Sequence, residues 1–79
     1  MISATVLIRS THGEFDRVVE RIGKIKGVMR IFPVLGRYDV VVDIEASNST
    51  SLGTAVLRMN RMSGVVFTET LVEVKEEEN

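Results

Sequence analysis

The sequence repeats itself at an offset of 37 residues. Residues 21–28, RIGKIKGV, align with residues 58–65, RMNRMSGV. Both segments follow the pattern Arg, apolar, any residue, basic, apolar, any residue, Gly, Val. Upstream apolar residues stay paired at the same offset: Phe15 with Leu52, Val18 with Ala55, and Val19 with Val56. A pattern of eight positions kept at one offset indicates two structural half-units with the same order of elements.

Each half-unit contains one predicted amphipathic helix. In the first half Thr11 and Glu14 resemble a capping box at the helix start, and Gly27 is expected to end the helix. In the second half the Ser- and Thr-rich segment 47–51 offers several N-caps, and Gly64 is the equivalent stop. The apolar positions at helical spacing are Phe15, Val18, Val19, Ile22 and Ile25 in one helix and Leu52, Ala55, Val56 and Met59 in the other.

Four segments rich in Val, Ile, Thr and aromatic residues predict strands over 2–9, 28–35, 38–45 and 65–74. Pro33 suits an edge strand. The order is βαββαβ, so we expect an α+β, ferredoxin-like fold: a four-stranded antiparallel sheet with two helices on one face. Alternation places Tyr38, Val40, Val42 and Ile44 on one side of the third strand and Asp39, Val41, Asp43 and Glu45 on the other, without deciding which side meets the helices.

Two helices can cover only one face of this sheet, and either choice leaves apolar residues on the other face. Such a face usually marks a protein–protein contact. A chain of 79 residues also has a marginal core, and natural domains of this size usually add disulfides, a metal or a partner subunit. With no Cys and a single His, the chain is left with self-association. We therefore expect a homodimer formed through the sheets.

Composition excludes several classes of protein. Hydrophobic residues make up 44% and charged residues 27%, as in ordinary globular domains. No apolar run is long enough to cross a bilayer and no signal peptide opens the chain, so we expect no membrane association and a cytoplasmic location. The net charge is −1 and the basic residues are scattered, which argues against direct binding of nucleic acid.

The sequence contains no catalytic constellation. His12 stands alone in a predicted loop. Asp39 and Asp43 share a face of one strand but lie about 13 Å apart, too far for a carboxylate dyad. Neither a phosphate-binding loop nor a dinucleotide glycine pattern occurs. We expect no enzyme activity, no metal and no cofactor.

The turn Gly36-Arg37-Tyr38-Asp39 is the segment with the most promising chemistry. One interpretation is structural, with glycine at a positive φ and the aspartate bonded back to the backbone. The other is a ligand site, because a carboxylate beside free backbone N–H groups suits a molecule with an ammonium group. The residues alone leave both interpretations open.

Together with Gly27-Val28 and the segment Gly64-Val65-Val66-Phe67-Thr68-Glu69-Thr70, this turn resembles the effector-binding half of the Lrp/AsnC (feast/famine) transcription regulators, the RAM domain. The resemblance covers residues 1–75 as one ligand-binding and oligomerisation domain, followed by an acidic tail at 76–79. It implies dimers that associate into octamer-like rings, and amino-acid effectors held between neighbouring dimers.

Carried over by residue, the resemblance implies that Gly36, Tyr38 and Asp39 line the effector cleft, with Thr68 and Thr70 as further candidates. Full-length members also carry a helix-turn-helix, which has no counterpart in this sequence. We therefore expect a stand-alone sensing module that could modulate full-length Lrp/AsnC regulators by mixed assembly.

Two alternatives share the βαββαβ order. An ACT-like regulatory domain would bind its ligand near His12 and Gly13, after the first strand. A small ferredoxin-like enzyme, either a dimeric α/β-barrel oxygenase or an acylphosphatase-like hydrolase, would need a polar cluster in the barrel or an anion-binding loop. Residues 9–13, RSTHG, offer only a faint version of such a loop. An oligomer with no ligand is a further possibility.

Overall fold

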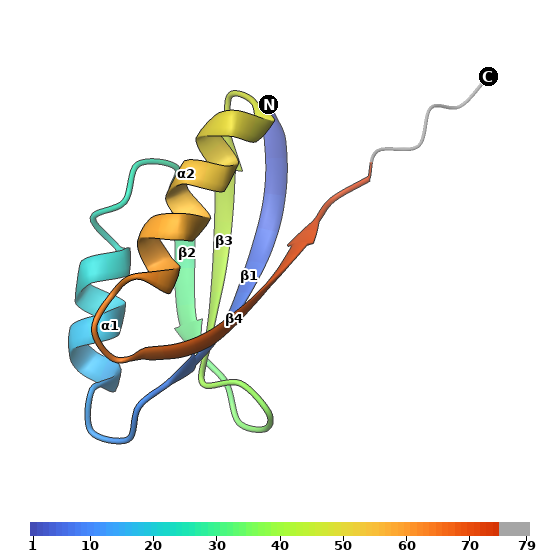
Figure 1. The fold of residues 1–79 in the computed structure, drawn as a ribbon. Coiled ribbons are helices and arrows are strands. Elements are labelled where there is room, and N and C mark those ends of the chain that lie inside the picture. Colours follow the sequence, from blue (N-terminus) through green and yellow to red (C-terminus); the bar gives the residue numbers. More distant parts are fainter. Residues whose placement is uncertain (75–79) are drawn as a thin grey trace.

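The structure, a computed structural model, describes residues 1–74. Its elements follow the predicted βαββαβ order (Figure 1). The predicted tail at 76–79 lies outside the described residues. The elements are β1 (Ile2–Ser10), α1 (Phe15–Ile22), β2 (Val28–Pro33), β3 (Val40–Ala46), α2 (Ser49–Asn60) and β4 (Val65–Val72).

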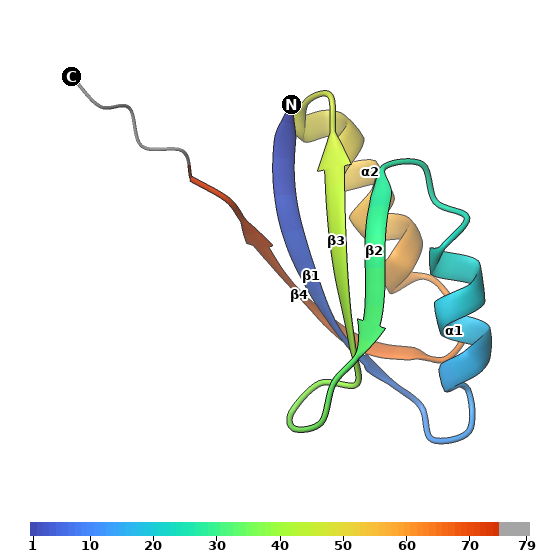
Figure 2. The ribbon, with the colours of Figure 1, turned by 180° about the vertical axis from the view of Figure 1, so that it is seen from behind.

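The four strands form one antiparallel sheet in the order β2-β3-β1-β4. Both helices lie on the same face, as Figure 1 shows from the helix side and Figure 2 from behind. The predicted fold class is therefore confirmed, and Pro33 does lie on an edge strand. β2 ends at Pro33 and β3 begins at Val40, so both predicted strands were too long at their shared end, where residues 34–39 form the connecting loop.

The 37-residue repeat extends to the hydrogen bonds that follow each helix. In the first half the N–H of Val28 donates to the carbonyl oxygen of Ile25 at 3.2 Å. At the matching positions of the second half the N–H of Val65 donates to Met62 at 3.1 Å. The sequence repeat thus encodes the same turn from helix to strand twice.

The repeated glycines turn the chain into the strand but do not end the helices. Gly27 has φ +98° and Gly64 has φ +95°, a region that favours glycine. The prediction that Gly27 ends the first helix is wrong, because α1 already ends at Ile22 and a turn separates the two residues. A Cβ on Gly27 would also collide with the carbonyl oxygen of Glu45, which is backbone and cannot move aside easily.

The two helix starts differ in how well the sequence predicts them. Asn48 caps α2, since its side-chain oxygen accepts from the N–H of Ser51 at 2.8 Å. The capping box at Thr11 and Glu14 is wrong: Glu14 is the N-cap of α1 and makes no side-chain capping bond. Instead the N–H of Glu14 donates to the carbonyl oxygen of Thr11, so a backbone turn precedes α1.

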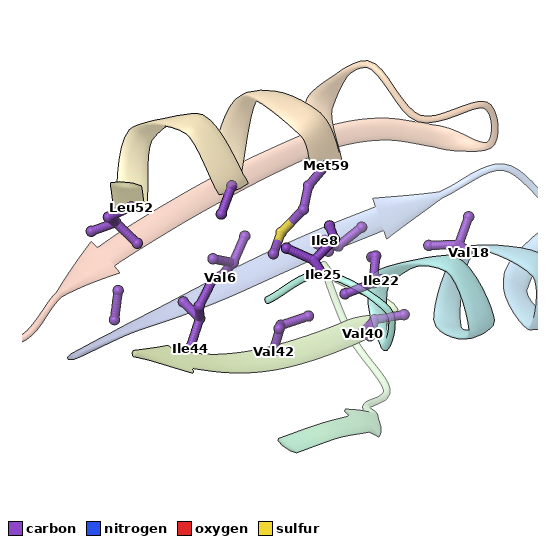
Figure 3. Close-up of a cluster of buried hydrophobic side chains, with 12 residues drawn as sticks. Val6, Ile8, Val18, Ile22, Ile25, Val40, Val42, Ile44, Leu52 and Met59 are labelled. Atoms are coloured by element: carbon purple, nitrogen blue, oxygen red, sulfur yellow. The ribbon is translucent and has the colours of Figure 1, made fainter. Parts of the chain in front are cut away.

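The core lies between the sheet and the helices (Figure 3). Alternate residues of β1 and β3 point into it, so the face of β3 that bears Val40, Val42 and Ile44 is the one that meets the helices. The buried residues are all apolar: Ala4, Val6, Ile8, Val18, Ile22, Ile25, Val40, Val42, Ile44, Leu52, Ala55 and Met59.

We call the other side of the sheet the open face, because within residues 1–74 no helix or strand lies over it (Figure 2). Its polar centre is the pair of Arg30 and Asp43, whose Nε and Oδ2 lie 3.6 Å apart, with the hydroxyl of Thr5 donating to the same carboxylate at 3.2 Å. Its apolar side chains are Leu7, Phe32, Val41, Phe67 and Leu71.

Candidate functional site

The candidate site is the loop between β2 and β3 and its surroundings. The N–H of Val34 donates to the carbonyl oxygen of Asp39 at 3.0 Å, and the N–H of Asp39 donates to Ile8 at 2.8 Å. The loop is thus closed at its base and fixed to β1. Gly36, near its tip, has φ +132°, and no atom lies within 4 Å of the position a Cβ would take. Backbone conformation alone therefore explains this glycine.

The carboxylate of Asp39 is half-buried and partly committed to the fold. Its Oδ2 accepts from the N–H of Ser10 at 2.9 Å, just where β1 ends. Among residues 1–74 its other oxygen, Oδ1, receives no hydrogen bond. Asp39 therefore orders the loop through one oxygen, and the interpretation of this carboxylate as a ligand site stays a prediction.

Tyr38 lies on the open face, against β4. Its ring stacks on Phe67, with centroids 6.1 Å apart and planes 14° from parallel. Its hydroxyl donates to Oε1 of Glu69 at 2.6 Å. This hydrogen bond is the main reason why the pKa of Tyr38 is raised above its ordinary value. The prediction that Tyr38 shares a face with Val40 is wrong, because Tyr38 precedes β3 and strand alternation does not apply to it.

A third link joins the loop to β1. The Nη1 of Arg9 donates to the carbonyl oxygen of Arg37 at 2.9 Å. Arg9 also pairs with Phe67 across the sheet. The loop end of the molecule therefore gathers an aromatic pair, the Arg9 guanidinium and a carboxylate that has one oxygen unbonded among residues 1–74.

Thr68 and Thr70 point to the other side of β4. In the sheet they pair with Ile8 and Val6, which face the core. The hydroxyl of Thr68 donates to Oδ1 of Asn60, the last residue of α2, at 2.7 Å. The structure therefore brings Gly36, Tyr38 and Asp39 together and leaves both threonines on the opposite face of the sheet.

The sequence did not single out Phe67, Glu69, Arg9 or Ser10. Phe67 and Glu69 alternate with the predicted threonines along the strand. This alternation was the available signal, because it places them on the other face of the sheet. What the pattern lacked was the register of β1 against β4, because that register decides which β4 side chains reach Tyr38.

The described residues contain neither a candidate metal site nor a candidate membrane-spanning helix. Among residues 1–74 no group of three or more His, Cys, Asp or Glu is placed to hold a metal ion. His12 lies exposed in the loop before α1. No helix of the described chain is long and apolar enough to span a bilayer.

Comparison with known proteins decides the family. Residues 3–78 match the family model described as the Lrp/AsnC ligand binding domain. The chain belongs to this family. The match favours the RAM-domain resemblance over the ACT-like and small-enzyme alternatives that the element order left open.

The curated relatives of this Lrp/AsnC domain are transcription regulators. The HTH-type transcriptional regulator FL11 of Pyrococcus furiosus is 28% identical over 74 residues, which are 94% of this chain and 49% of that regulator. The HTH-type transcriptional regulator LysM of Saccharolobus solfataricus is 29% identical over 72 residues, 90% of this chain and 51% of that protein. The chain spans about half the length of the curated relatives it matches.

Solved structures share the fold over 94% or more of the chain. TTHA0845 from Thermus thermophilus superposes with a TM-score of 0.91 at 29% identity, with 100% of both chains covered. FFRP-DM1 gives 0.89 at 23% identity over 94% of this chain and 100% of that one. The regulator NMB0573 of Neisseria meningitidis, solved as a complex with L-Met, gives 0.83 at 16% identity over 99% of this chain and 53% of that one.

Proposed function

We propose that this Lrp/AsnC domain is an oligomeric sensing module that binds an amino acid at the loop between β2 and β3. The observation that carries the proposal is the half-buried Asp39 carboxylate, which has one oxygen bonded to Ser10 and one free of partners among residues 1–74. An ionised carboxylate in this state can accept from an α-ammonium group without losing its place in the fold.

The neighbouring groups support the same class of ligand. The backbone beside Gly36 is open, since nothing lies within 4 Å of the position of a Cβ. The stacked rings of Tyr38 and Phe67 offer an apolar wall. We place Gly36, Tyr38 and Asp39 at the centre of the site. Thr68 and Thr70 remain weaker candidates, because they lie on the opposite face of the sheet and the hydroxyl of Thr68 is already bonded to Asn60.

The regulator NMB0573, which shares this fold, forms a complex with L-Met. We extend the class of ligand, free amino acids, to this chain. We further propose that the module acts on transcription by mixed assembly with full-length Lrp/AsnC regulators, and that it has no catalytic role. The domain would span 1–75, with 76–79 as an acidic tail.

A thermal-shift screen of the purified chain against the twenty amino acids tests the effector. A ligand that binds only the folded state, at 100 times its dissociation constant, adds about 2.7 kcal/mol of stability, which raises Tm by several degrees in a domain of this size. We expect one amino acid or a few related ones to do so. No shift with any of the twenty would contradict the sensing function and leave an assembly role.

Assembly through the open face is the second part of the proposal, and the chain offers a matched pair of variants for it. Leu71 on the open face is 51% exposed, while Leu57 on α2 is 52% exposed. We expect Leu71→Glu to lower the oligomeric state in light scattering because it places a charge within the sheet contact. Leu57→Glu should leave the state unchanged. The opposite result would move the interface to the helices.

A further inference from the structure

A cavity of about 460 Å³ lies at the end of the molecule opposite the β2–β3 loop. It opens between one flank of α2 and residues 25–29, which lead from the turn after α1 into β2. β3 runs from Val40 at the loop end to Ala46 at the cavity end, so the two ends are separated by about 20 Å along the strand. The cavity is therefore not an extension of the site proposed above.

The floor of the cavity is apolar and fixed. Ile25 is 4% exposed and Ala55 is 7% exposed, and both belong to the core. Ala46 adds to the floor, and Met29 lines the cavity from the edge strand β2. A methionine side chain adapts readily to the shape of a ligand. The volume falls within the usual range for small-molecule sites, roughly 300–1,000 Å³.

Two basic side chains line the cavity, and neither is paired with an acidic residue in the described part of the chain. Neither Lys26 nor Arg58 forms an ion pair with any of residues 1–74, whereas Lys24, two residues away, is paired with Glu20. The one carboxylate among the lining residues, Glu45, accepts from the hydroxyl of Ser3, its cross-strand neighbour on the open face. The cavity thus has a net positive lining above an apolar floor.

Three of the four hydroxyl groups along this flank of α2, those of Ser47, Ser51 and Thr54, already have a hydrogen-bond partner. The hydroxyl of Thr54 donates to the carbonyl oxygen of Thr50 at 3.0 Å, and the Oγ atoms of Ser47 and Ser51 lie 3.5 Å apart. Polar recognition therefore falls mainly to Lys26 and Arg58. A highly hydroxylated ligand such as a sugar would find few free groups, while an anion would find two.

We infer that this cavity is a second small-molecule site, which takes a small organic anion with an apolar body, such as a branched-chain carboxylate. The apolar body lies over Ile25, Ala46 and Ala55, and the carboxylate lies between Lys26 and Arg58. Both the carboxylate and the apolar body of the ligand are needed for binding. Exposed ion pairs contribute little by themselves, and an apolar body without a charge makes no ion pair with Lys26 or Arg58. This inference does not rest on the site proposed above.

The four methionines provide the probe for this site, because Met1 and Met29 line the cavity while Met59 and Met62 do not. We propose to follow binding by methyl NMR of the full chain labelled with ¹³C at the methionine methyl groups, a method that also works for large oligomers. Titration with isocaproate should shift the Met29 signal saturably and leave Met59 and Met62 in place. Isocaproamide has the same shape without the charge, and its affinity should be lower by about tenfold or more.

A pair of double variants separates the cavity from general charge effects. Lys26→Gln with Arg58→Gln should weaken the binding of isocaproate by about tenfold or more, whereas Lys24→Gln with Arg61→Gln, which changes the net charge equally, should not. Asp39→Asn should leave isocaproate binding unchanged, which keeps this test independent of the proposed amino-acid site. The inference is overturned by the absence of a saturable Met29 shift, by equal binding of the amide or of acetate, or by loss of binding in Asp39→Asn.

Discussion

The two ends of the sheet use their polar groups in opposite ways. At the loop end Asp39, Tyr38 and Arg9 are each bonded to another part of the fold: to Ser10, to Glu69 and to the backbone of Arg37. At the cavity end Lys26 and Arg58 form no ion pair with residues 1–74. Variants at the loop end should therefore change stability as well as binding, while charge variants at the cavity end should change binding alone.

Glycine substitutions should give the largest loss of stability, and the loss should differ between the two ends of the sheet. Gly27→Ala at the cavity end should destabilise the fold by about 3 kcal/mol or more, because of its positive φ and because its Cβ would meet the carbonyl of Glu45. Gly36→Ala should lose only about 1–2 kcal/mol, since the space around it is empty. Urea unfolding of both variants measures the difference, and equal losses would contradict it.

Removing the Asp39 carboxylate should have the next largest effect. Asp39→Ala leaves the N–H of Ser10 without its acceptor, so we expect a loss of about 1–2 kcal/mol in the free energy of unfolding. Asp39→Asn keeps an oxygen in place and should lose less. If Asp39→Ala proves as stable as the native chain, its bond to Ser10 does not hold the loop.

Tyr38 allows a direct titration, because the chain has one Tyr and no Trp. Its pKa is raised, chiefly by the hydrogen bond to Glu69, then by burial and by the charge of Glu69, and is lowered by Arg37. Absorbance near 295 nm should show a midpoint above the ordinary value of about 10, and Glu69→Gln should lower it. A midpoint that Glu69→Gln does not move would contradict the contact.

The same titration carries a stability effect of known sign. Since the folded pKa of Tyr38 lies above the unfolded one, its contribution is fully present below about pH 10 and is lost as the pH rises through the folded value.

Charge removal at the cavity end should have the smallest effect. Lys26→Gln with Arg58→Gln should change the free energy of unfolding by less than about 0.5 kcal/mol, because both groups are unpaired within residues 1–74. Thermal unfolding of this double variant and of Asp39→Ala under the same conditions compares the stability losses at the two ends directly. A larger loss than that of Asp39→Ala would reverse the contrast between the two ends.

Local patterns predicted most of the fold. The repeat of RIGKIKGV and RMNRMSGV predicted two half-units, and both halves have the same turn, with Gly27 and Gly64 at nearly equal φ. The end of α1 was missed because the apolar spacing runs on to Ile25, which is buried from the turn beyond the helix. Side-chain spacing cannot distinguish a helix from a turn that buries the same residue.

The site was only partly predictable, for a physical reason. Gly36, Tyr38 and Asp39 adjoin in the chain, so their proximity followed from the sequence. The contacts of Tyr38 with Phe67 and Glu69 depend on the register between β1 and β4, which is set by packing. The cavity joins three segments far apart in the chain, and no local pattern marks it.

The most direct test of the sensing function is the affinity of the best amino acid from the screen for the native chain and for Asp39→Asn, measured by isothermal titration calorimetry. The variant keeps an acceptor for Ser10 and lacks only the charge that would hold an ammonium group. We predict an unchanged fold and an affinity lower by about tenfold or more. Equal affinity in the two chains would contradict the role of Asp39 and move the effector site away from this loop.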